Sequence, residues 1–168
     1  MPGTPEIGLV PIDRTVAREA ADAGAAFITA HALVTEGVRE LMAGVIGMTP
    51  AHMLDHGAWG GFFVFDSASR QVVGTCGFKM PPDADGAVEI AYYTFPPFER
   101  RGYAGAMARE LSGRAQAATE VRTIVAHTLA EPNASTGILK RAGFDYMGEI
   151  IDPEDGRVWR WAIEKQSP

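Results

Sequence analysis

Two prolines, two arginines and a glycine stand directly in front of a helical segment in residues 95–115, FPPFERRGYAGAMARELSGRA. Proline lacks an N–H group, so Pro96-Pro97 ends the preceding strand. Gly102 lets the backbone turn tightly or approach a ligand closely. A helix that begins after it exposes unpaired N–H groups and the positive end of its dipole. Together with the arginines, this segment predicts a phosphate or pyrophosphate site.

The common nucleotide motifs do not account for this segment. The Walker pattern needs Gly-Lys-Ser/Thr, which is absent, and the dinucleotide pattern needs three spaced glycines where only Gly102 and Gly105 are present. The loop also follows a mid-chain series of apparent hairpins rather than an early parallel strand. Taken alone, the segment is equally compatible with an ordinary strand-to-helix turn carrying surface arginines.

Three segments in sequence order resemble the GNAT superfamily of acyl-CoA-dependent N-acyltransferases. They read EIAYYTFPPFERRGYAGAMARELSGRA, VAHTLAEPNASTGILKRAGF and DGRVWRWAI. The similarity runs from about residue 59 to residue 163 and is to the branch that contains the ribosomal-protein N-terminal acetyltransferases. The family's phosphate loop is Gln/Arg-x-x-Gly-x-Gly/Ala, and residues 99–104 read Glu-Arg-Arg-Gly-Tyr-Ala. Glu99 departs from the pattern at its first position. The departure affects a side-chain contact, whereas the main-chain amides that would bind the phosphate do not depend on it.

The resemblance implies acetyl-CoA as co-substrate and no metal. It implies that the strand at 88–95 splays from the strand at 123–128 and that the pantetheine arm lies in the gap. The arm is expected to pair with main-chain groups around residues 93–95, and the pyrophosphate with amides of residues 101–106. Asn133 is expected to contact the ligand, or only to cap a helix. The implied binding residues are Tyr93, Thr94, Phe95, Arg100, Arg101, Gly102, Tyr103, Ala104, Gly105, Ala106 and Asn133.

Glu89 is the candidate base. An amine that attacks a thioester must lose a proton, because a protonated amine has no lone pair. Glu89 lies where relatives often carry a glutamate, and by strand alternation it shares a face with Ala91, Tyr93 and Phe95. We therefore expect a carboxylate among aromatic side chains. The alternative is an exposed glutamate that only binds a cationic substrate.

Ser135 is the candidate acid for the departing thiolate. Many relatives place a tyrosine four residues before a Gly-Phe pair, and here that position is Leu139. In the ribosomal branch a serine near the helix start is the suggested substitute, and Ser135 matches it. Two alternatives stay open: Ser135 only supports the helix start, or the thiolate leaves unaided, since a thiol titrates near 8.5.

The elements that must position these residues alternate between strands and helices. Strands are expected at 8–12, 61–66, 71–80, 87–95, 122–128, 146–151 and 157–165, and helices at 15–35, 38–45, 103–115 and 133–142. Asn133 is the expected N-cap of the last helix and Gly143 its C′ residue. We expect one α/β domain over residues 1–168, with a GNAT-like, mostly antiparallel sheet, splayed at the CoA site and covered by helices on both faces.

Composition excludes several classes. The chain has 168 residues, a net charge of −6 and one cysteine, so bulk nucleic-acid binding, an internal disulfide and a cysteine-rich zinc site are not expected. No apolar run is long enough for a membrane span. We expect a cytoplasmic enzyme that acetylates a small-molecule or peptide amine; the acceptor and a homodimer are left open. The rival interpretation is a non-catalytic acyl-CoA-binding module.

Overall fold

The computed structural model describes residues 3–22 and 34–166. The strands are β1 (Ile7–Pro11), β2 (Gly61–Asp66), β3 (Val72–Phe78), β4 (Ala87–Thr94), β5 (Thr123–Leu129), β6 (Asp145–Asp152) and β7 (Gly156–Glu164). The helices are α1 (Arg14–Asp22), α3 (Glu36–Met48), α4 (Tyr103–Ala117) and α5 (Ala134–Arg141), with 3-10 helices η1 (Ala51–Asp55), η2 (Gly57–Trp59) and η3 (Pro96–Phe98). The expected helix at 15–35 is observed in its first part as α1; its residues 23–33 lie outside the described ranges, and residues 34 and 35 are not helical.

The described strands form one seven-stranded sheet in the order β1-β2-β3-β4-β5-β7-β6. Every neighbouring pair is antiparallel except β4 and β5, which run parallel. The parallel pair arises because α4 lies between these strands in the chain and carries the backbone across one face of the sheet. This topology confirms the predicted mixed, mostly antiparallel sheet.

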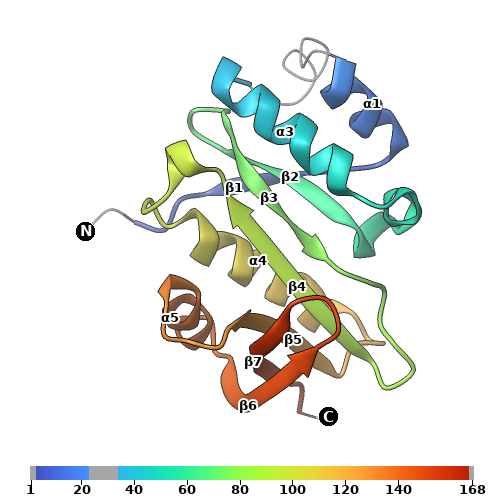
Figure 1. The fold of residues 1–168 in the computed structure, drawn as a ribbon, viewed down its shortest axis with the longest axis vertical. Helices are drawn as coiled ribbons and strands as arrows, with labels where there is room; N and C mark the ends of the chain where they lie inside the picture. Colours follow the sequence, from blue (N-terminus) through green and yellow to red (C-terminus); the bar gives the residue numbers. More distant parts are fainter. Residues whose placement is uncertain (1–2, 23–33, 167–168) are drawn as a thin grey trace.

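Helices cover both faces of the sheet. Figure 1 shows α1 and α3 in front of the half that contains β2 and β3, and α4 behind β4. Phe62, Phe63 and Val64 follow one another in β2 and are all buried, because both faces of this strand are covered. Gly74 of β3 lies against β4 and α4: a Cβ there would stand 2.2 Å from the carbonyl oxygen of Tyr93. A residue without a side chain is therefore needed for this close approach.

Of the two helices that precede and follow β5, α4 begins at the predicted residue and runs two residues further, and α5 lies within its predicted range. In α4 the apolar stripe Tyr103, Met107, Leu111 and Ala115 is buried, as its spacing indicates. Helix α5 packs against α4 and is followed by Gly143 with φ +91°, a left-handed conformation that glycine adopts without strain. Within the described ranges, no helix is long and apolar enough to cross a membrane.

Candidate active site

Strands β4 and β5 separate after three paired positions. Their register runs from Ala87↔Thr123 to Glu89↔Val125 and stops there. Beyond that point β4 continues beside β3 and β5 continues beside β7. A pocket of about 350 Å³ opens between the strands, called here the strand cleft. Its lining includes Glu89, Ile90, Ala91, Tyr92, Ala126, His127, Thr128 and Ser135.

The register of β3 and β4 decides which main-chain groups of β4 face the strand cleft. Lys79 N donates to Glu89 O at 3.0 Å, and Phe95 N donates to Val73 O at 2.8 Å. Bonded positions alternate along an antiparallel pair. Residues 89, 91, 93 and 95 therefore bond to β3, whereas residues 90, 92 and 94 direct their N–H and C=O groups toward the cleft.

This register corrects part of the expected pantetheine contact. The main chains of Tyr93 and Phe95 are engaged with β3, and the Phe95 carbonyl also accepts from Phe98 N at 2.8 Å. Thr94 fits the expectation, and Tyr92 joins it. The Thr94 hydroxyl is buried and has no hydrogen-bond partner in the described part of the chain. A buried polar atom without a partner fits a site whose ligand supplies one.

The loop before α4 has the backbone geometry of a main-chain anion cradle. Arg100 has φ +61° and Gly102 has φ +87°, so two residues in quick succession adopt the left-handed conformation. For an arginine this conformation is strained. Alternating backbone signs of this kind point successive N–H groups into one concavity. The N–H groups of residues 103–105 begin α4 and have no acceptor within it, which adds the helix N-terminus to the same site.

Ala106 does not belong to the cradle, because its N–H group donates to Gly102 O at 3.1 Å and closes the first turn of α4. The side chains around the loop also point elsewhere. The Tyr103 hydroxyl donates to Asp66 at 3.0 Å, and burial raises the pKa of Tyr103. The Arg101 guanidinium lies 5.6 Å from the centre of the Phe98 ring. The cradle is thus built from backbone amides, with arginine side chains at its edge.

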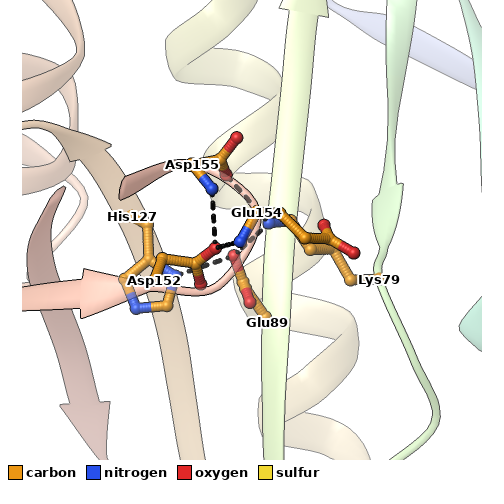
Figure 2. Close-up of polar contacts among 6 residues, drawn as sticks. All are labelled: Lys79, Glu89, His127, Asp152, Glu154 and Asp155. Atoms are coloured by element: carbon orange, nitrogen blue, oxygen red, sulfur yellow. Dashed lines mark hydrogen bonds and ion pairs between the residues drawn. The ribbon is translucent and has the colours of Figure 1, made fainter. Parts of the chain in front are cut away.

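Glu89 lies at the point where β4 and β5 separate. Its carboxylate contacts the ammonium group of Lys79, directly after β3, and the imidazole of His127 on β5 (Figure 2). Its Oε1 is 2.8 Å from Lys79 Nζ and 2.9 Å from His127 Nδ1. Burial opposes the charge on Lys79, but the hydrogen bond and charge of Glu89 outweigh it, so the pKa of Lys79 is raised. The contacts that hold Glu89 are thus with Lys79 and His127, two partners that strand alternation does not reveal.

The turn between β6 and β7 closes one side of the strand cleft. Asp152 accepts from the N–H groups of Glu154 and Asp155, at 2.8 and 2.9 Å, and these bonds lower the pKa of Asp152. The turn brings an Asp155 oxygen to 3.8 Å from Lys79 Nζ. Figure 2 shows this turn beside Glu89. Lys79 therefore stands between two carboxylates contributed by β4 and by the distant hairpin.

The start of α5 contributes one hydroxyl group to the cleft, that of Ser135. Asn133 is the N-cap: its Oδ1 accepts from Thr136 N at 3.1 Å, and Thr136 Oγ1 accepts from Asn133 N in return. This confirms the predicted cap. Ser135 follows directly, lines the strand cleft and shares a hydrogen bond with the Tyr92 hydroxyl. Burial raises the pKa of Tyr92, so its phenol is protonated at neutral pH.

Leu139 is fully buried in the core and does not line the strand cleft. A phenol nonetheless reaches the cleft, because Tyr92 projects from β4 toward Ser135. The sequence motifs assign no role to Tyr92, although it lies within one of them, and Lys79 lies outside all three motif segments. The signal that could have found Tyr92 is its place on the same strand as Glu89.

A second cavity of about 490 Å³ lies on the α3 side of β3 and β4 and is called here the apolar pocket. Its described lining comprises Ile12, Val45, Met48, Thr49, Pro50, Met53, Gly61, Thr75, Cys76, Gly77, Phe78, Lys79, Ala91, Tyr92 and Tyr93. Lys79, Ala91 and Tyr92 line both cavities, so the two meet beside Glu89. Burial raises the pKa of the Cys76 thiol to about 12, which keeps it protonated and unreactive at neutral pH.

The described residues hold no group of three or more His, Cys, Asp or Glu side chains that could bind a metal ion. The site therefore consists of a strand cleft with free main-chain groups, an amide cradle for an anion at one end, a carboxylate at the other, and an adjoining apolar pocket. These features suit a long ligand with a phosphate group and a peptide-like arm, and a second reactant that reaches it from the apolar side.

Comparison with known proteins agrees with this geometry. Residues 13–145 match the family described as the acetyltransferase (GNAT) domain, so the chain belongs to the GNAT acetyltransferase family. The match includes the N-terminal helices, which the sequence resemblance had placed only by position. The protein is accordingly an N-acetyltransferase that uses acetyl-CoA as co-substrate. A search of curated protein sequences found no match.

Solved structures share the fold at low sequence identity. One is RimL, the ribosomal L7/L12 alpha-N-protein acetyltransferase in complex with coenzyme A, at 15% identity and TM-score 0.67 over 98% of this chain and 96% of that one. The aminoglycoside acetyltransferase AAC(6')-Ib with coenzyme A has 13% identity, TM-score 0.68 and 95% coverage of both chains. Mutant forms of the Vibrio cholerae spermidine/spermine N-acetyltransferase SpeG have 15% identity and TM-score 0.64, over 94% and 93%.

Proposed function

We propose that the strand cleft holds the acetyl-pantetheine arm and that a primary amine reaches the thioester from the apolar pocket. The observation that carries this proposal is the meeting of the two cavities at Lys79, Ala91 and Tyr92, directly beside Glu89. The main-chain groups of Tyr92 and Thr94 pair with the arm, and the cradle around Gly102 binds the pyrophosphate. Asn133, at the start of α5, keeps its cap and adds a side-chain amide near the cleft.

The reaction is a direct transfer. The amine nitrogen bonds to the thioester carbonyl carbon, the carbon–sulfur bond breaks, and coenzyme A leaves as the thiol. Glu89 takes the proton that the amine loses, directly or through water, using the oxygen that Lys79 and His127 leave free. Ser135 donates a proton to the sulfur and is resupplied by the Tyr92 phenol, to which it is hydrogen-bonded.

The acceptors considered are the amines of peptides and small molecules. RimL, AAC(6')-Ib and SpeG are named for a protein N-terminus, an aminoglycoside and polyamines, respectively. Their common feature is a primary amine, and this is the group that we propose for the acceptor here. The cytoplasmic location and the homodimer considered from the sequence stay predictions.

A turnover experiment separates the enzyme from a pure acyl-CoA binder. With acetyl-CoA and a panel of primary amines, we expect one thiol released for each N-acetylated amine detected by mass spectrometry. A binding module would raise the melting temperature with acetyl-CoA but release no thiol with any amine. Because Cys76 is buried and protonated, it contributes little to a thiol assay on the folded protein.

Replacement of Ser135 by alanine tests the acid. We expect the single-turnover rate of acetyl transfer to fall by roughly 10²-fold, within the usual range for acid–base help. Tyr92→Phe should cost a similar factor, and the double variant little more, if the two hydroxyls act as a unit. Rapid-quench measurement of the acetylated amine gives these rates.

Thr136→Val is the matched control for Ser135→Ala. Thr136 forms the reciprocal capping bonds of α5 but does not line the strand cleft. The control should lose about 1 kcal/mol of stability while keeping the chemical rate. A Ser135→Ala enzyme with a full chemical rate would show that the thiolate departs without an acid.

A further inference from the structure

The apolar pocket contains no acidic side chain among its described lining residues. Aliphatic, aromatic and thioether side chains form most of the wall, and its uncharged polar groups are two threonines, two tyrosines and a protonated thiol. The chain carries 21 aspartates and glutamates and a net charge of −6. The lack of acids in this pocket is therefore a local property of the site and does not follow from the composition.

Lys79 is the only charged residue in that described lining, and it stands where the apolar pocket meets the strand cleft. Its ammonium group is held 2.8 Å from Glu89 and 3.8 Å from Asp155. The carboxylate nearest to the reacting amine is thus already paired with a cation of the protein. A second cation on the acceptor would lie near Lys79, whose two neighbouring carboxylates are already paired with Lys79 itself, and would meet its like charge, which is unfavourable in an apolar cavity.

The volume of about 490 Å³ sets the scale of the acceptor, because pockets of this size enclose one compact organic molecule or the end of a longer one. From the lining, the charge and the volume, we infer that the acceptor is a primary amine on a compact apolar body, with no second cationic group near the reacting nitrogen. This inference rests on the proposed function, since it assigns the apolar pocket to the amine.

An acceptor of this kind differs from polyamines and aminoglycosides, which carry several cationic groups. Polycations gain affinity from several carboxylates around the amine, and the described wall offers none. An apolar body instead gains from leaving water for the wall formed by residues such as Val45, Met53 and Phe78. The single ammonium of such an amine can give up its proton to Glu89 once it reaches the cleft.

The first experiment compares 2-phenylethylamine with spermidine as acceptors at fixed acetyl-CoA, with product detection by mass spectrometry. We expect kcat/KM to be at least about tenfold higher for 2-phenylethylamine, a factor of the size that hydrophobic pockets give. A value for spermidine equal to or above that of 2-phenylethylamine would overturn the inference. If no amine in the panel is acetylated although acetyl-CoA binds, the proposed function itself fails.

Two matched variants then test whether the apolar pocket sets the preference. Met53 is half-buried in its wall, so Met53→Glu adds a carboxylate and Met53→Gln adds a polar group of the same size without charge. Met53→Glu should lower the ratio of kcat/KM for 2-phenylethylamine over spermidine by about threefold or more relative to Met53→Gln. Equal ratios in the two variants would place the amine outside this pocket and contradict the inference.

Folding is checked by the shift in melting temperature that coenzyme A produces in each variant. Should Met53→Glu fail to fold, Met48→Glu with Met48→Gln repeats the comparison, because Met48 lines the same pocket and is 82% exposed. A charged side chain at such an exposed position costs little stability.

Discussion

Glu89→Gln is expected to lower kcat by roughly 10² to 10⁴-fold, the usual range for removal of a general base. Affinity for coenzyme A should change much less, because the cradle around Gly102 and the main chain of β4 are untouched. Glutamine has nearly the same shape and can still accept from Lys79 or His127, so the fold is preserved. The acidic limb of the pH–rate profile should move or vanish.

Asp155→Asn is the matched control for this prediction. It removes a carboxylate from the same neighbourhood, 3.8 Å from Lys79, without removing the proposed base. Steady-state kinetics over pH 6–9 and calorimetry with coenzyme A give all the quantities needed. An unchanged kcat and pH–rate profile in Glu89→Gln would show that Glu89 is only the ion-pair partner of Lys79 and not the base.

Gly102→Val is expected to weaken coenzyme A binding by at least about tenfold, or roughly 1.4 kcal/mol. Gly102 has φ +87°, which a β-branched residue adopts only with strain, and a Cβ there would lie 3.1 Å from Pro5 Cδ. The loop must therefore change conformation, and the N–H groups that converge on the anion are moved. Bonds from such amides to a charged acceptor are each worth about 1.5–3 kcal/mol.

Gly113→Ala provides the control in the same helix. A Cβ at Gly113 meets nothing within 4 Å, so alanine should stabilise α4 by about 1 kcal/mol and leave coenzyme A binding unchanged. Calorimetry and melting curves on both variants separate a damaged cradle from a damaged fold. A folded Gly102→Val protein with wild-type affinity would refute the placement of the pyrophosphate.

The separation of β4 and β5 explains why one fold can provide both cavities. β4 is bonded to β3 from Glu89 to its end at Thr94, but to β5 only from Ala87 to Glu89. One edge of β4 is then left for a ligand that pairs like a strand, while its α3 face forms a wall of the apolar pocket. In the proposed function, reactants that approach from the two sides meet at the residues that line both cavities.

Sequence by itself determined the features that depend on neighbouring residues. Pro96-Pro97 ends β4 because proline cannot donate to a strand ladder, and Gly102 precedes α4 because it adopts positive φ freely. Asn133 caps α5 through a bond to a residue three positions later. The motif segments at these positions were sufficient to identify the family and the fold.

Tertiary structure alone decided what surrounds the reacting groups. Lys79 and His127 meet Glu89 from positions 10 and 38 residues away, and Tyr92 meets Ser135 across the opened pair of strands. The β3–β4 register directs the main-chain groups of Tyr92 and Thr94 toward the strand cleft, beyond the last β4–β5 pair. Such contacts depend on how separate strands are paired and packed, and local residue patterns do not specify the side chains that a distant strand or turn brings alongside.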